Sequence, residues 1–167
     1  MKLNTAVMFS KATDEWATPD AMFRELDAEF CFEVDAAATN GNAKCATFFG
    51  PGSVYPDALA LVEWGRPYKP AMVFLNPPYS RCREFIAKAA EQSQKGNTVV
   101  ALVPSRTDTR WWHEHIWDHE SHLPWPGVEI RFIKGRLKFG NSDNSAPFPS
   151  VVIVFRPVVA SQEPACP

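Results

Sequence analysis

The sequence predicts a single α/β domain in which helices cover a mixed β-sheet. Short apolar runs with the length of buried strands lie at 72–75 and 98–103. Two segments with an apolar stripe at helical spacing, 19–29 and 80–95, alternate with these runs. The chain has 167 residues, of which 46% are hydrophobic and 22% charged, so its length suits one domain with a sizeable core.

Charge and cysteine usage narrow the class of protein. The four cysteines show no paired spacing, which is typical of a reducing cytoplasm, and we expect neither a signal peptide nor a membrane span. The net charge of −2 is unevenly divided: residues 1–65 carry 4 Lys or Arg against 10 Asp or Glu, and residues 66–167 carry 13 against 9. The basic second half can form a phosphate-binding face, although a chance imbalance on a solvated surface gives the same count.

The N-terminal third predicts a helix and then a strand that ends in a carboxylate. Thr18 is the expected N-cap of a helix over 19–29, with Pro19 at the first helical position. A short strand over 31–34 then leads to Asp35 and three alanines. A carboxylate at a strand end, followed by small residues, can approach a ligand closely and accept a hydrogen bond from its amino group. The alternative role for Asp35 is a plain helix cap.

The stretch AMVFLNPPYS at 71–80 carries the most specific chemistry. Pro77 and Pro78 end its strand abruptly, because each proline lacks an N–H donor and fixes φ. Asn76 and Tyr79 are therefore expected in a rigid turn at the carboxyl end of a buried strand, where open α/β sheets place their ligands. The side-chain oxygen of Asn76 and the main-chain oxygen of Pro77 are two convergent acceptors, which suit the –NH2 group of a base or an amide. Tyr79 offers a flat face for stacking; an ordinary proline-rich turn is the alternative.

Another helix and strand are expected after this turn. Ser80 is the candidate cap of a helix that runs to Lys95, and the strand at 98–103 ends at a proline. Arg106 and Arg110 follow, beside the expected pocket. They either contact phosphate or pair with acidic neighbours.

The last part of the chain predicts an antiparallel hairpin. Strands are expected at 128–139 and 150–155, because the segment between them is polar and rich in turn residues. The first of these strands carries four cations, of which the last three share a face by alternation: Arg131, Lys134, Arg136 and Lys138. Phe148 either reaches the pocket edge or plugs the core. Residues 1–15 and 157–167 are expected to be a flexible arm and a disordered tail, which leaves 16–156 as the domain.

The tetrapeptide at 76–79 resembles motif IV, [DNS]-P-P-[YFW], of the amino-methyltransferases that use S-adenosylmethionine. The wider chain resembles the small phage-type DNA N-6-adenine methyltransferases of the Dam family. The matching segments, in the same order, are WATPDAMFRELDAEF, FEVDAAATNGNAKC, LNPPYS, LVPSRTDTRWWH, and IRFIKGRLKFG followed by APFPSVVIVF. This resemblance implies a Rossmann-like class I methyltransferase fold, with three layers and a mixed sheet.

The resemblance also implies an activity: methyl transfer from S-adenosylmethionine to N6 of an adenine flipped out of double-stranded DNA, inside a bacterial or phage-infected cell. The catalytic turn would consist of Asn76, Pro77, Pro78 and Tyr79. Cofactor contacts are implied for Thr18, Pro19, Asp35, Ala36, Asp57 and Asn76. Contacts to DNA or the flipped base are expected for Tyr79, Arg106, Arg110, Lys134, Arg136 and Phe148. The chain departs from the wider pattern at the cofactor loop, where three alanines replace the usual glycines.

Two other functions stay open. The same tetrapeptide suits a protein glutamine amide, although such N-methyltransferases usually keep a clear Gly-rich loop. A catalytically inert DNA-binding remnant is the other alternative, and the intact tetrapeptide argues against it.

All four histidines fall between residues 113 and 122. On a helix, His115, His119 and His122 would lie on one face, a spacing that brings zinc into consideration. Two prolines close the segment, no cysteine lies nearby and the H-E-x-x-H pattern is absent. We therefore expect no metal and interpret the segment as a polar insertion near DNA or solvent.

Overall fold

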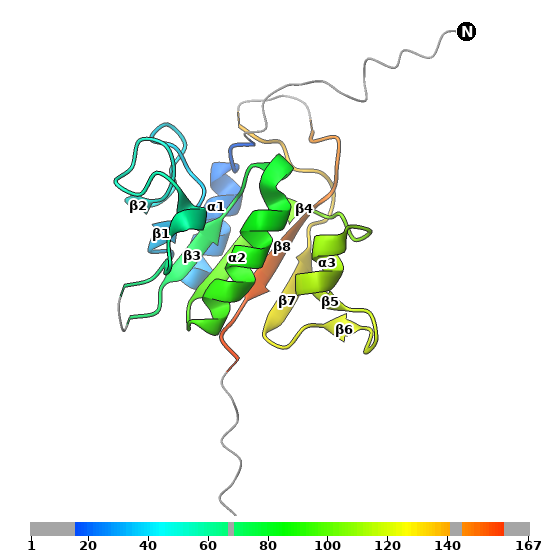
Figure 1. Cartoon of the computed structure of the whole chain (residues 1–167). Coiled ribbons are helices and arrows are strands. Elements are labelled where there is room, and N and C mark those ends of the chain that lie inside the picture. The colour runs from blue at the N-terminus through cyan, green and yellow to red at the C-terminus, as the bar shows by residue number, and fades with distance from the viewer. Residues whose placement is uncertain (1–15, 67–68, 141–144, 159–167) are drawn as a thin grey trace, which may run out of the picture.

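A six-stranded mixed sheet forms the centre of the fold (Figure 1). The computed structural model describes residues 16–66, 69–140 and 145–158. The strands of the sheet are β1 (Val34–Asp35), β2 (Thr47–Phe48), β3 (Met72–Leu75), β4 (Thr98–Pro104), β7 (Val128–Phe132) and β8 (Ser150–Phe155). They are arranged in the order β2-β1-β3-β4-β8-β7, with the first four parallel and β8 antiparallel to both of its neighbours. The predicted mixed α/β sheet with a terminal antiparallel hairpin is confirmed.

Helices on both faces make this sheet the middle of three layers. In Figure 1, α1 (Asp20–Phe30) lies behind the sheet, and α2 (Cys82–Gln94) and α3 (Arg110–His115) lie in front of it. In the described part of the chain, the remaining elements are two 3-10 turns, η2 (Ala58–Ala60) and η3 (Tyr79–Arg81), and a separate hairpin of β5 (Trp117–Asp118) and β6 (Leu123–Pro124). No described helix has the length and apolar character needed to cross a membrane.

The apolar pattern of the sequence explains which faces are buried. Every residue of β4 and β8 is buried, as are the last three residues of β3, because helices cover both faces of these strands. The helix α2 packs Phe85, Ile86 and Ala89 into the core. The three described cysteines are free thiols. The expected arm at 1–15 and most of the expected tail lie outside the described residues, so these remain predictions.

The first helix begins one residue later than predicted. Its N-cap is Pro19, whose ψ of 135° is extended, and no side chain caps the helix. Thr18 does not act as the cap, because its hydroxyl oxygen accepts a hydrogen bond from the Asn76 side chain instead.

The second predicted helix start is also wrong. Ser80 lies inside the η3 turn, and α2 starts after it, at Cys82. This tight turn follows Pro78 directly and leads the Tyr79 ring into the interior, where Tyr79 is 9% exposed.

The strand expected at 31–34 is shorter and begins later. Cys31 has a φ of 53° and closes α1, with its N–H donating to the main-chain oxygen of Asp27. The chain turns at this residue, so β1 is limited to Val34 and Asp35.

The strand expected at 128–139 ends at Phe132. The β7–β8 connection spans residues 133–149, and its described residues, 133–140 and 145–149, leave the sheet because Phe139 is buried in the core, where it is 4% exposed. The prediction that three cations share a strand face is therefore wrong. These cations lie in the connection: Lys134, Arg136 and Lys138.

The helix that would align the histidines does not form. α3 stops at His115, and His119 and His122 lie in the turn between β5 and β6. The Asp118 carboxylate stabilises this turn by accepting hydrogen bonds from the main-chain N–H groups of Glu120 and Ser121.

Candidate active site

A cavity of about 420 Å³ opens where β1 and β3 end. Most of its wall comes from residues 16–18, 35–39, 49–51, 56–58 and 76–78. These segments are far apart in the sequence, and the parallel strands bring them to one edge of the sheet. The cavity gathers five of the residues predicted to contact a cofactor: Thr18, Asp35, Ala36, Asp57 and Asn76. Pro19, the sixth, is not among the described residues that line it.

Asp35 places a desolvated carboxylate in this wall. The residue is 3% exposed, and burial raises the pKa of its carboxyl group to about 6. Its oxygens accept main-chain hydrogen bonds from Lys44, at 3.0 Å, and Ala37, at 3.4 Å. No described helix starts at this residue, so the helix-cap alternative is wrong. A buried carboxylate with one weak and one good donor suits a cationic or amino ligand.

The first residues after Asp35 are three alanines, and the loop keeps its tight shape there without a glycine. Gly50, at the end of the neighbouring β2, supplies the missing space: a Cβ there would lie 2.0 Å from the main-chain oxygen of Ala38. The side-chain oxygen of Asn42 accepts hydrogen bonds from both the N–H and the hydroxyl of Thr39. Sequence reasoning missed Gly50 and Asn42, because it sought the glycine within the loop rather than on the adjacent strand.

Asp57 and Lys44 complete the rim of the cavity. Asp57 is exposed, and its carboxylate accepts the N–H of Leu59 at the start of η2. Lys44 lines the cavity and forms an ion pair with Asp20 of α1. Nothing in the sequence pattern marks Lys44, since its partner lies 24 residues away.

Asn76 has a fixed amide orientation. Its Nδ2 donates to the main-chain oxygen of Trp16, at 2.5 Å, and to the Thr18 hydroxyl, at 2.9 Å. A carbonyl oxygen only accepts hydrogen bonds, so the nitrogen of the amide must face Trp16. Its Oδ1 is buried and has no hydrogen-bond partner among the described residues. The side chain therefore offers one unsatisfied acceptor next to the cavity.

Tyr79 is covered by three aromatic side chains, Trp16, Phe139 and Phe148, which we call the aromatic cover. The Trp16 ring is nearly parallel to the Tyr79 ring, with centroids 6.3 Å apart. Phe148 and Phe139 meet Tyr79 edge-on, at 5.3 and 6.2 Å. The Tyr79 hydroxyl has no partner among the described residues, and burial raises the pKa of this hydroxyl above its usual range. Phe148 packs against the core and on the Tyr79 ring, and it is not among the described residues that line the cavity, so its contact with a flipped base stays a prediction.

The predicted DNA-contacting cations differ in their contacts. Arg110 forms an ion pair with Glu114 within α3, and Arg106 is exposed in the loop after β4. Lys134 is exposed, and Arg136 reaches the main-chain oxygen of Ala146 at 3.4 Å.

Arg131 belongs to the fold. Its guanidinium donates to Glu29 of α1, at 2.6 and 2.7 Å, and lies 5.2 Å from the centre of the Phe30 ring. These contacts hold α1 against β7.

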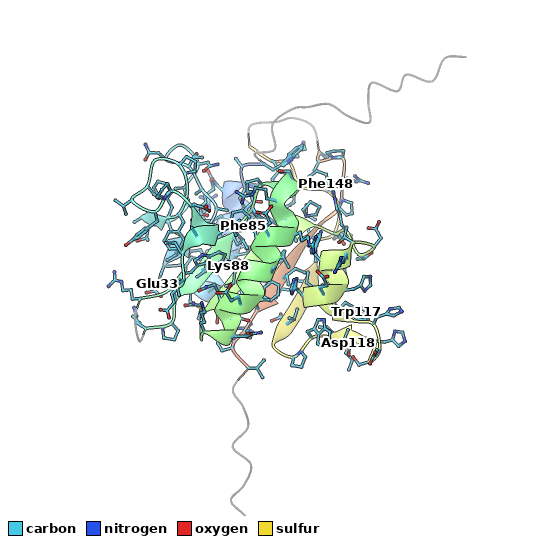
Figure 2. The ribbon with its side chains drawn as sticks, in the orientation of Figure 1. Glu33, Phe85, Lys88, Trp117, Asp118 and Phe148 are labelled. Carbon is cyan, nitrogen blue, oxygen red and sulfur yellow. The ribbon has the colours of Figure 1, made fainter. Side chains whose placement is uncertain are left out.

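The histidine segment lies away from the cavity. The hairpin precedes β7, whose first residue, Val128, pairs with Phe155 at the end of β8, far from the strand ends that border the cavity. In Figure 2, Trp117 and Asp118 of this hairpin lie at the opposite end of the molecule from Phe148. Within the described ranges, no group of three or more His, Cys, Asp or Glu residues is arranged to hold a metal ion.

Comparisons with known proteins agree with the resemblance read from the sequence. The family model described as DNA N-6-adenine-methyltransferase (Dam) matches residues 6–164. A DNA N-6-adenine-methyltransferase of Escherichia phage T1 is 33% identical over 102 residues, which cover 60% of this chain and 40% of that protein. A DNA N-6-adenine-methyltransferase of Haemophilus phage HP1 is 26% identical over 147 residues, 86% of this chain and 79% of that protein. No solved structure matches. Since the family model spans nearly the whole sequence, the chain belongs to the DNA N-6-adenine-methyltransferase (Dam) family.

Proposed function

We propose that this chain transfers a methyl group from S-adenosylmethionine to N6 of adenine in DNA. Family membership supports this, and one observation about the chain carries it. The Asn76 amide donates both of its hydrogens to the protein and keeps Oδ1 as a buried acceptor without a partner among the described residues. An acceptor held in this way suits an –NH2 group brought in by a substrate.

The residues that line the cavity suit the methyl donor and support this proposal. Bound S-adenosylmethionine supplies a methyl group on a positively charged sulfur, and it also carries an ammonium group. Asp35 offers a buried carboxylate for a positive charge, and Ala36, which is 0% exposed, keeps that wall close to the ligand. Asp57 stands at another part of the wall and is a further candidate for contact.

The residues of the turn would orient the target amine. Asn76 Oδ1 and the main-chain oxygen of Pro77 accept its two hydrogens, so the nitrogen lone pair points away from both. The catalytic contribution of the chain is then mainly orientation of two reactants. No strong base is needed if the surplus proton leaves the nitrogen after the new bond has formed.

An adenine flipped out of the duplex would stack on Tyr79, which requires the aromatic cover to move. Trp16 and Phe148 lie over the Tyr79 ring at 6.3 and 5.3 Å between centroids. Their displacement would free the ring face and give access to the buried Asn76 oxygen. Lys134, Arg136 and Arg106 are the proposed phosphate contacts around this edge, with Arg110 available if its pair with Glu114 opens.

The test is methyl transfer by the purified protein to adenine-containing duplex DNA, followed by nucleoside analysis. We expect N6-methyladenine as the product with wild-type protein and none with Asn76→Ala. Asn97→Ala is the matched control, because it removes a buried amide that bonds Ala71 and Gln92 at the opposite end of the sheet. It should lower the melting temperature and retain transfer well below that temperature. Transfer to a glutamine peptide but not to DNA would contradict the proposal.

A further inference from the structure

We infer that Thr18 is a positioning residue for Asn76: its hydroxyl holds the catalytic amide so that Oδ1, and not Nδ2, meets the target amine. The inference rests on the proposed function of the site. It assigns Thr18 a role toward the substrate, which differs from contact with the cofactor.

Two acceptors from one short segment engage the Asn76 amide. The Trp16 main-chain oxygen and the Thr18 hydroxyl receive the two Nδ2 hydrogens at 2.5 and 2.9 Å. The main-chain carbonyl of Trp16 determines that the nitrogen of the Asn76 amide faces this segment, because an amide oxygen in the same position would be repelled by the carbonyl oxygen. The second bond, to Thr18, restricts rotation of the amide plane about its terminal torsion, which is otherwise broad.

The segment itself is anchored at Trp16 and Ala17. The Trp16 ring packs on Phe139 and Phe148, at 5.5 and 5.2 Å between centroids. The main-chain oxygen of Ala17 accepts the N–H of Gly140 at 2.8 Å. Thr18 is 5% exposed, so water does not compete freely for its hydroxyl. An acceptor held by its own packing can hold a reactive group in place.

Kinetics of Thr18 variants separate this role from contact with the cofactor. Thr18→Val keeps the side-chain shape and removes the acceptor, whereas Thr18→Ser keeps the acceptor. We expect Thr18→Val to lower kcat at least about tenfold, since small misplacement of a reacting group costs up to about 10². The Kd for S-adenosylmethionine, measured by calorimetry, should change less than about twofold, and Thr18→Ser should restore most of kcat.

A matched control tests whether any buried threonine has this effect. Thr98 is 8% exposed at the start of β4, opposite Met72 at the far end of β3. Thr98→Val should leave kcat within about twofold of wild type. The inference is overturned if Thr18→Val keeps kcat, if its loss lies entirely in cofactor affinity, or if Thr18→Ser is equally poor.

The side-chain amide of Asn76 gives a readout that needs no activity. Its two NMR signals, identified by their loss in Asn76→Ser, should exchange slowly with solvent in wild type and in Thr18→Ser. One of them should exchange at least about tenfold faster in Thr18→Val and not in Thr98→Val. Equal exchange in all variants would overturn the positioning role even in an active enzyme. Absence of methyl transfer by wild type, with the predicted exchange pattern, would overturn only the proposed function.

Discussion

Replacing Asp35 by asparagine should stabilise the ligand-free protein and weaken its binding of the cofactor. Burial raises the pKa of the Asp35 carboxyl group from 3.8 to about 6. The folded chain therefore binds this proton more tightly than the unfolded chain does. Stability falls as the pH rises from about 4 to about 6, and it stays lower above that range. At about 1.4 kcal/mol per pKa unit, the ionised carboxylate costs the ligand-free fold about 3 kcal/mol at pH 8.

Asparagine removes the charge and keeps an oxygen for the Lys44 N–H, which is the shorter of the two contacts at 3.0 Å. Its –NH2 group then faces the Ala37 N–H, at the 3.4 Å contact, so part of the gain is lost. We expect a net stabilisation of about 1–3 kcal/mol at pH 8, or roughly 3–10 °C in melting temperature. The gain should shrink toward zero near pH 4, where the wild-type carboxyl group is protonated in the folded state.

The same substitution should weaken S-adenosylmethionine binding by about 1–3 kcal/mol, as expected for a lost charge-assisted contact. Melting curves from pH 4 to 8 and calorimetric titrations at pH 8 test both effects. Asp57→Asn is the matched control: it removes an exposed charge from the same cavity and should shift the melting temperature by less than about 2 °C. A stability gain that does not vary with pH, or unchanged cofactor affinity, would refute the reasoning.

Three further predictions concern the turn and the basic connection. Asn76→Asp keeps an acceptor, so the sequence alone predicts residual activity. Aspartate, however, cannot donate to the Trp16 main-chain oxygen, which lies 2.5 Å from the Asn76 amide nitrogen. We therefore expect the kcat of Asn76→Asp in a methyl-transfer assay to approach that of Asn76→Ala. Tyr79→Phe should keep kcat and melt no lower than wild type, because the lost hydroxyl has no partner among the described residues. Tyr79→Ala should lose methyl transfer, and denaturant melts should show a loss of about 3–5 kcal/mol of stability. Replacing Lys134 and Arg136 by alanine should reduce the slope of log affinity against log salt by about 2 in DNA-binding titrations, and an unchanged slope would remove both from the interface.

The central turn could be predicted from the sequence because its causes are local. Four consecutive apolar residues make β3, and the two prolines that follow prevent its continuation. The same locality placed Asp35 at the end of a strand. Asp35 and Asn76 face one cavity because β1 and β3 are parallel neighbours that end at the same edge of the sheet.

The contacts that give the turn its chemistry are not local. The two acceptors of the Asn76 amide lie 58 and 60 residues earlier in the chain. A helix cap was the simplest role for Thr18, since a Thr-Pro pair before an apolar stripe is a common helix start. Only the packing of that segment against the turn shows that its hydroxyl has another partner.

The limits of strand periodicity explain the error in β7. Alternation alone continued the strand to residue 139, yet the ladder with β8 ends at Phe132. Burial of Phe139 beside Tyr79 outweighs further strand pairing, because a large aromatic side chain removes more apolar surface from water than one edge-strand residue does. As a result, the cations of the β7–β8 connection lie outside the sheet.

The β7–β8 connection links the two parts of the proposed function, phosphate binding and access to Tyr79. The β7–β8 connection carries Lys134 and Arg136, the proposed phosphate contacts, and also Phe139 and Phe148 of the aromatic cover. A shift of the connection on DNA binding would therefore move the rings that lie over Tyr79. Opening the cover loses ring contacts, but it also relieves a buried acceptor without a partner, whose desolvation costs about 1–3 kcal/mol. In the proposed function the target amine would satisfy that acceptor, so DNA binding and formation of the reactive geometry would favour each other.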